Sequence, residues 1–353
     1  MSAPDKPYVG GQAVIEGVMM RAPRSMAIAV RRPDGSIVFR EDAWISIWEH
    51  LKFLRWPLLR GSVVLVESLY NGLQALNFAA SHAMLDGEEP PDPTEDTSSG
   101  GSNALTMAFS FALAIGLFVG LPHLLAWGTG ELAGAELGLD SFLFHLLDGL
   151  FKLAIFVGYI SAISLIPEIR RVFEYHGAEH KVVNVYENEL PLTIDNARAF
   201  PTFHARCGTS FILFVLVLSI FMFAVVFPFI PTVSDITVVN HLAMILIKVP
   251  LMIPLSGFAY EINRFAARHP EQLWVQLLVV PGRLMQKLTT KEPSDDQLEI
   301  ALAAMQAALA REASLVDVDV AAAKAIKDAQ PVGGHVAVFG SYGELAAAID
   351  TGR

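Results

Sequence analysis

Four long runs of apolar residues dominate the middle of the chain. They cover residues 104–127, 142–166, 209–230 and 238–260, and each can cross the roughly 30 Å hydrocarbon core of a bilayer as a helix. Pro167 follows the second run, and Pro250 and Pro254 predict a kink in the fourth. The pattern predicts an α-helical membrane protein with about four transmembrane helices, which form a membrane domain over residues 104–260.

Lysine and arginine are distributed unevenly between the connections of these runs. Residues 128–141 and 231–237 contain neither, whereas both occur before the first run, between the second and third, and after the fourth. Because cytoplasmic connections carry the excess of basic residues, we expect both termini and the connection 167–208 to be cytoplasmic. The chain is thus predicted to be a multi-pass protein surrounded by the lipid bilayer.

A different pattern precedes the first run. Short β-branched stretches flank Pro33-Asp34-Gly35, where proline fixes φ and glycine accepts positive φ, so residues 9–40 are predicted to form strands. Residues 61–80 predict either a re-entrant or interfacial helix or an amphipathic helix packed on the soluble part. We therefore expect a β-rich cytoplasmic segment with such a helix over residues 1–83, then an acidic, Pro/Ser/Gly-rich linker over 84–103.

Residues 261–313 are predicted to form cytoplasmic helices, which complete a small α+β portion. The clearest helix covers 295–313, with Ser294 and Asp295 as candidate caps. Its apolar stripe consists of Leu298, Leu302, Met305 and Leu309. Such a stripe predicts docking on the cytoplasmic part or a homo-oligomer. The tail 314–353 carries no functional signal.

Composition narrows the class of protein. The 353 residues are 53% hydrophobic and only 17% charged, and the formal net charge is −11. These values exclude a purely soluble domain, a disordered chain and a nucleic-acid binder that depends on overall positive charge. The single cysteine excludes an intrachain disulfide and a zinc site made of cysteines alone.

The connection 167–208 carries the candidate chemistry. His176, Glu179 and His180 form an H-x-x-E-H pattern, and in a helix the two imidazoles share a face on which they can bind one zinc ion. Glu179 is the candidate catalytic residue, as general base towards a water molecule. His204 or Cys207 is the preferred third ligand. Glu187 and Glu261 rank behind them. The competing interpretation is a set of histidines that only hold the connection in place.

The residues after this motif favour another backbone. Residues 182–186 are β-branched and alternating, so we expect a helix that ends near Lys181, followed by a strand.

Ionisable residues also occur inside the apolar runs. His145, Asp148 and Lys152 form one stripe of the second run, His123 ends the first, and Lys248 lies inside the fourth. Because Asp148 and Lys152 can pair at i, i+4, an anchoring role is favoured over a proton or ion path.

An acidic residue in the first apolar strand also needs a partner. Glu16 lies in such a strand, bounded by glycines, and Arg21 or Arg24 is its expected structural partner.

Several motifs together resemble a known family. GGQAVIEGVMMR at 10–21, RRPDGSI at 31–37, YHGAEHK at 175–181, RCGTSF at 206–211 and TTKEPSDDQLEIA at 289–301 resemble the YqhQ family of bacterial membrane proteins. The resemblance extends to about residue 310, and it implies a protein of the bacterial cytoplasmic (inner) membrane.

The family is of unknown function and is described only as a predicted metal-dependent enzyme. The resemblance therefore implies a divalent metal, with zinc preferred. It carries over to His176, Glu179, His180, His204 and Cys207, whereas Ala205 stands where the family usually has proline.

Two functions are expected from these observations. The first is a metal-dependent hydrolase with its site at the cytoplasmic face and an unknown substrate. The alternative is a non-catalytic, oligomeric membrane protein, either a channel, a transporter or an assembly scaffold. A redox or metal sensor that uses Cys207 is a third, weaker hypothesis.

Overall fold

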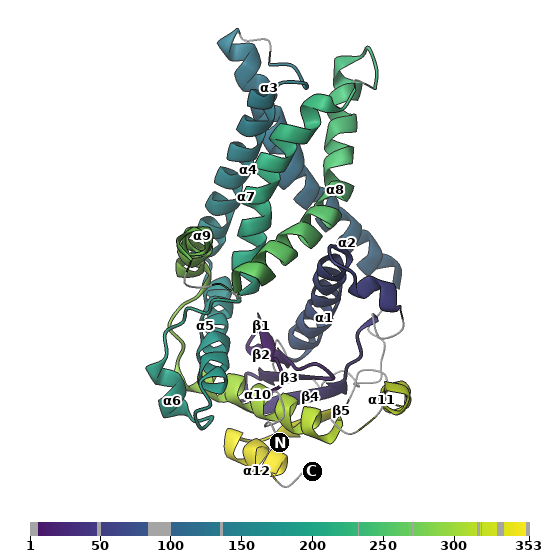
Figure 1. The fold of residues 1–353 in the computed structure, drawn as a ribbon. Helices are drawn as coiled ribbons and strands as arrows, with labels where there is room; N and C mark the ends of the chain where they lie inside the picture. Colours follow the sequence, from purple (N-terminus) through teal and green to yellow (C-terminus); the bar gives the residue numbers. More distant parts are fainter. Residues whose placement is uncertain are drawn as a thin grey trace.

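The computed structural model describes residues 6–47, 51–83, 100–134, 137–231, 233–267, 269, 272–315, 318, 320–329 and 335–350. It shows a long helix bundle standing on a small sheet, to which both the N-terminal and the C-terminal part of the described chain contribute strands (Figure 1). Most of the predicted acidic linker, at 84–99, lies outside the described residues. We call the end of the bundle away from the sheet the distal end.

Among the residues that the structure describes, four helices are long and apolar enough to cross a membrane: Ala108–Ala133, Phe142–Ile163, Gly208–Phe229 and Thr237–Phe265. The first comprises α2 (Gly100–Ile115), the π-helical turn η3 (Gly116–Gly120) and α3 (Leu121–Ala133). The others are α4 (Phe142–Ile163), α7 (Gly208–Val226) with η4 (Phe227–Phe229), and α8 (Thr237–Ala267). Within the described part of the chain a candidate span is thus present at each of the four predicted places, and the first extends to Ala133, beyond its predicted end at residue 127.

The fourth of these helices is bent. Pro250 and Pro254 lie inside α8, and the ribbon changes direction near its middle (Figure 1). Proline removes a backbone donor and its ring clashes with the preceding turn, which accounts for the predicted kink.

The sheet has five antiparallel strands in the order β1-β2-β3-β4-β5. Four come from the first part of the chain, namely β1 (Gly10–Val14), β2 (Gly17–Arg21), β3 (Ser25–Arg31) and β4 (Ile37–Ala43). Arg31 pairs with Ile37 across the predicted turn, and Gly35 adopts φ +86°, which confirms the hairpin. The fifth strand, β5 (His335–Phe339), comes from the tail, so the two ends of the chain share one sheet.

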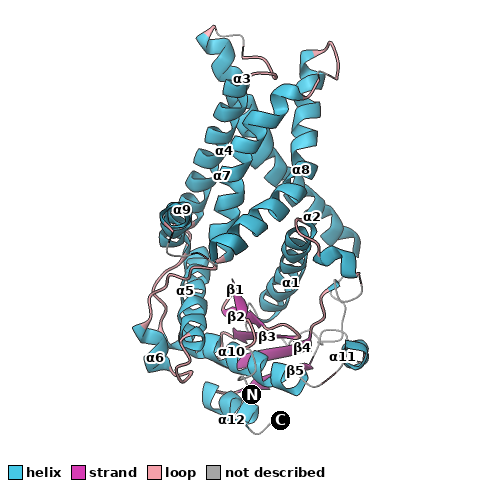
Figure 2. Cartoon of the chain, in the orientation of Figure 1, coloured by secondary structure: helices cyan, strands magenta, loops and turns pink. Residues whose placement is uncertain are grey.

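Helices cover both faces of the sheet (Figure 2). On one face α5 (Pro167–Glu187) and α10 (Asp295–Leu315) bury the apolar side chains of β2 and β3. On the other face lies α1 (Leu59–Ala83). The shorter helices are η2 (Lys52–Arg55), α6 (Ile194–Ala199), α9 (Leu273–Thr289), α11 (Val320–Asp328) and α12 (Tyr342–Asp350).

The apolar stripe of α10 packs within the chain. Leu298, Leu302 and Met305 are fully buried against the sheet and α5, and Leu309 is partly buried there. Of the two predicted roles, the stripe therefore has the first, since it docks on the sheet and α5 of the same chain.

The predicted amphipathic segment forms α1, which packs on two partners. Ala75 and Phe78 are buried on the sheet, and Gly61 lies so close to Tyr260 of α8 that a Cβ would come within 2.5 Å of it. Val66 and Leu69 on the opposite side remain exposed.

The strand predicted after Lys181 is wrong, because α5 continues as a helix to Glu187. Val182, Val183 and Val185 are at most 1% exposed and belong to the core between the sheet and α10. Burial of these side chains therefore outweighs the weak preference of valine for strands.

Candidate metal centre

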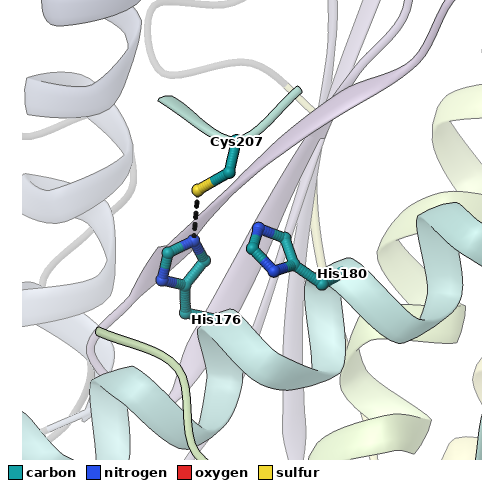
Figure 3. A group of neighbouring side chains, drawn as sticks. All are labelled: His176, His180 and Cys207. Atoms are coloured by element: carbon teal, nitrogen blue, oxygen red, sulfur yellow. Dashed lines mark hydrogen bonds between the residues drawn. The ribbon is translucent and has the colours of Figure 1, made fainter. Parts of the chain in front are cut away.

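Two segments far apart in the sequence meet at the sheet end of the bundle. His176 and His180 lie one helical turn apart on α5, and their ring centroids are 4.4 Å apart. Cys207 is the residue before α7 and approaches both imidazoles from the opposite side (Figure 3). The helix predicted at the motif is thus present, and it places both imidazoles on the face that meets Cys207.

The three side chains converge on one point. His176 Nε2 is 3.2 Å from Cys207 Sγ, and one candidate ligand atom of each residue lies within 4.8 Å of the other two. Bonds of about 2.0–2.3 Å from histidine nitrogen and cysteine sulfur set the size of a zinc site. Only small side-chain movements separate this arrangement from three ligands on a shared ion.

Backbone carbonyls orient both imidazoles. Nδ1 of His176 donates to the carbonyl oxygen of Thr289 at 2.8 Å, and Nδ1 of His180 donates to that of Thr202 at 2.6 Å. Because a carbonyl oxygen only accepts, the hydrogen of each neutral ring lies on Nδ1, and the lone pair of Nε2 points towards Cys207. This arrangement is the usual support of metal-ligating histidines.

One of these lone pairs has no partner. Nε2 of His180 is buried and makes no hydrogen bond to any residue that the structure describes. Burial also lowers the pKa of His180, which keeps its imidazole neutral and able to coordinate. An unpaired acceptor inside a histidine and cysteine group is what a metal site requires, so the residues present fit a metal ion.

Glu179 lies beside the cluster and is buried against the first strand. Its Oε2 is 3.6 Å from His180 Nε2. Its carboxylate accepts from the backbone of Gly11, and a Cβ at Gly11 would come within 2.4 Å of Glu179 Cγ. Burial raises the pKa of Glu179 above the ordinary value of a glutamate.

The other ligand candidates lie outside the group of three. His204 faces His180 with ring centroids 5.6 Å apart, and its Nε2 is 3.3 Å from Glu187. Glu187 also pairs with Arg206. Glu261 lies on α8, where it pairs with Arg60 of α1. Among the third ligands considered, the geometry therefore favours Cys207.

The sequence did not reveal the residues that hold this group in place. Gln286 of α9 accepts from the backbone N–H of His204 and donates to the carbonyl of His204 and to Ser210. Thr289 and Thr202 supply the two carbonyl oxygens. Of these residues, the sequence pointed only to Thr289, because it is the first residue of the motif at 289–301.

The prediction for the partner of Glu16 is wrong. Its carboxylate accepts two hydrogen bonds of 2.5 Å from Arg171 and one of 3.3 Å from Tyr175, whereas Arg24 binds Glu312 and two carbonyls near the end of α10. The contact joins the β1–β2 turn to α5, an element that lies far away in the sequence.

Comparison with known proteins identifies relatives without a known activity. Residues 56–311 match the model of a family described as "Protein of unknown function (DUF1385)". The "Uncharacterized protein YqhQ" of Bacillus subtilis (strain 168) is 36% identical over 322 residues, which cover 87% of this chain and 94% of that protein. No solved structure matches the chain.

Proposed function

The chain belongs to the DUF1385 family of proteins of unknown function and is similar to YqhQ. We propose that it is a membrane-embedded, metal-dependent hydrolase. Its four apolar helices support residence in a membrane. The distribution of lysine and arginine supports an orientation with both termini and the metal centre on the cytoplasmic face. The bacterial relative supports placing the protein in the bacterial inner membrane.

The metal ligands in this proposal are His176, His180 and Cys207. The observation that carries it is the pair of imidazoles whose Nδ1 hydrogens are fixed on carbonyl oxygens while both Nε2 atoms face one thiol. A donor set of two nitrogens and one sulfur favours zinc among the divalent metals. When bound, zinc supplies a Lewis acid.

Glu179 is the proposed general base. With three protein ligands a zinc site keeps one position open, and Oε2 of Glu179 lies 3.6 Å from the ligand atom of His180. Its carboxylate would accept a proton from a water molecule that attacks the substrate. The raised pKa of Glu179 makes it a stronger base than a solvent-exposed glutamate.

The position of the centre supports a substrate that is reached at the membrane surface. His176 and His180 lie on α5, which begins directly after α4, and Cys207 immediately precedes α7. Both α4 and α7 are candidate membrane spans. The centre therefore adjoins the sheet-side ends of two spans.

Elemental analysis of the purified full-length protein tests the metal site. We expect roughly one zinc ion per chain in the wild type and none in the His176→Ala/His180→Ala double variant or in Cys207→Ser. His335→Ala, which removes an exposed histidine of β5, should keep the metal. Wild-type protein without stoichiometric metal, or a double variant that retains it, would contradict the proposal.

A second assay tests the role of Glu179. Glu179→Gln should keep its zinc but lose metal-dependent hydrolysis of a panel of chromogenic carboxylate and phosphate esters. Equal hydrolysis rates in the wild type and in Glu179→Gln would refute the role of general base.

A homo-oligomeric channel, transporter or scaffold is the second candidate function. It is favoured by a group of charged side chains buried between the candidate spans. Four spans are few for a transporter, so this function requires several copies around an axis. Mass measurement in detergent decides, because a strictly monomeric protein would exclude it.

A further inference from the structure

A second buried polar group lies near the distal end of the bundle, between α3, α4 and α8. We call it the distal cluster. Each of its side chains is at most 9% exposed, and they are His123, His145, Asp148, Lys152, His241 and Lys248. Ionisable groups between apolar helices are costly to bury and usually have a function.

Two ammonium groups share one carboxylate in the distal cluster. Lys152 lies 3.9 Å from Asp148, the pair expected at i, i+4. Lys248 of α8 is much closer, with Nζ donating to Asp148 Oδ2 at 2.5 Å. The other oxygen, Oδ1, is buried without a hydrogen-bond partner among the described residues. With both lysines protonated, the cluster therefore carries a net positive charge between apolar helices.

The imidazoles form a chain that starts at Lys248. Its Nζ donates to Nδ1 of His123 at 3.2 Å, and Nε2 of His123 lies 2.8 Å from Nδ1 of His241. An ammonium group only donates, so the hydrogen of His123 lies on Nε2 and is donated to His241. The hydrogen of His241 then lies on its own Nε2. Every bond in this chain points away from Lys248.

The chain ends in the wall of a cavity. His241 lines a cavity of about 560 Å³ at the distal end, together with Trp127, Glu131, Asp140 and other residues of the two distal connections. A cavity of this size has room for several water molecules, and His241, Glu131 and Asp140 supply polar groups in its wall. Its two carboxylates favour hydronium and disfavour anions.

We propose that His241 and His123 carry protons between this cavity and Lys248, so that the solution at the distal end sets the charge of the Lys248–Asp148 pair. In the outward direction Lys248 gives a proton to Nδ1 of His123. His123 passes its Nε2 hydrogen to Nδ1 of His241, and His241 releases its Nε2 hydrogen to water.

The proton balance of this step is complete without any other reactant. Lys248 becomes neutral, both imidazoles end neutral with their hydrogens on the other nitrogen, and one hydronium forms in the cavity. The groups that surround Lys248 are Asp148 and Lys152 of α4, His123 of α3 and the ring of Phe227. His145 and His241 lie within electrostatic reach of its ammonium group. Loss of the proton leaves one carboxylate with one ammonium, which removes the net charge from the apolar surroundings.

His145 supplies the matched control. It is as buried as His123, but its Nε2 bonds to the carbonyl oxygen of Leu139, so it takes no part in the chain. Lys152 likewise is a buried lysine beside Asp148, and it contacts neither His123 nor His241.

Proton exchange of the lysine side chains tests the proposal. The probe is the full-length protein, labelled with ¹⁵N at lysine Nζ and placed in lipid nanodiscs. Magnetic resonance measures the exchange of each ammonium with water, and Lys→Arg variants assign the signals. We expect Lys248 to exchange faster than Lys152 in the wild type.

Variants then identify the route. His241→Phe should slow exchange at Lys248 roughly tenfold or more, because the proton must then await a local opening of the bundle. His145→Phe should leave it unchanged. Equal exchange of Lys248 and Lys152 in the wild type, a comparison that needs no variant, would overturn the proposal. Equal slowing by the two histidine variants would overturn it as well.

Discussion

In the metal centre each imidazole donates its Nδ1 hydrogen to a backbone carbonyl. In the distal cluster two imidazoles bond to each other, and one of them also bonds to an ammonium group. A carbonyl holds the hydrogen on one nitrogen and leaves a fixed lone pair on the other, which suits coordination. A bond between two imidazoles allows their hydrogens to move in concert, which suits proton transfer.

Charge separates the two groups further. In the distal cluster Lys248 and Lys152 already surround Asp148, so a metal cation would meet strong repulsion there. At the metal centre the nearby Lys181 points to Glu292 and the carbonyl of Arg198, away from the ligand atoms. The neighbours of a buried histidine, rather than its burial, therefore determine which chemistry it can perform.

Removal of the shared carboxylate should have the largest effect. Asp148→Asn leaves two ammonium groups buried without a counter-charge and should cost about 3–5 kcal/mol of stability. Thermal unfolding in detergent measures it, with Asp140→Asn in the exposed cavity wall as control. If both variants unfold at the same temperature, Lys248 is not a buried cation and the contrast between the two groups fails.

Crowding the first strand should have the next largest effect, and at the metal centre only. Gly11→Ala forces a methyl group against Glu179 Cγ and should cost about 1–3 kcal/mol. It should also weaken metal binding, because Glu179 and His180 are neighbours on α5. Gly10→Ala is the matched control, since its Cβ would meet nothing closer than 3.8 Å. Equal stability and zinc affinity in the two variants would show that β1 does not position the centre.

Much of the fold could be predicted from local pattern. Apolar length gave the four candidate spans, and the turn at Pro33-Asp34-Gly35 gave the hairpin, because both signals act within a few residues. The helical spacing of His176 and His180 likewise placed their rings on one face.

Contacts between distant segments could not be predicted in the same way. Residues 182–186 look like a strand until the sheet and α10 bury their valines. Lys248 is 100 positions from Asp148 and 125 from His123, and no local spacing joins these three residues. The strand β5 is another case, since its pairing with β4 depends on the two chain ends meeting.

Acid should change the stability contributions of two histidines and of Glu179 at the metal centre in opposite directions. Burial lowers the pKa of His180 and His204, so below the ordinary value of 6.5 the unfolded chain binds more protons there and stability falls as the pH falls. Burial raises the pKa of Glu179, so its contribution falls as the pH rises above 4.5 and through the raised value. The net slope is the difference between these two effects.

Variants of the metal-free protein separate the two contributions. Thermal midpoints between pH 5 and pH 8 should rise less, or fall more, with increasing pH in His204→Gln than in the wild type, because one group that destabilises the fold in acid is gone. They should rise more steeply with pH in Glu179→Gln, because the opposing group is gone. Identical profiles for these variants and the wild type would show that neither side chain is buried as the structure has it.

The smallest effect is expected at the exposed ion pair between Glu16 of the β1–β2 turn and Arg171 of α5. Arg171 is 52% exposed, so water screens the pair, and Glu16→Gln should cost less than about 1 kcal/mol. Glu16 also adopts φ +50°, a strained conformation that glycine tolerates, so Glu16→Gly should regain most of that loss. Chemical denaturation of both variants measures the difference. Zinc affinity should stay unchanged in both variants, because contact with Gly11, and not the Glu16–Arg171 pair, positions Glu179. If Glu16→Gln loses as much zinc affinity as Gly11→Ala does, the Glu16–Arg171 pair positions Glu179 instead.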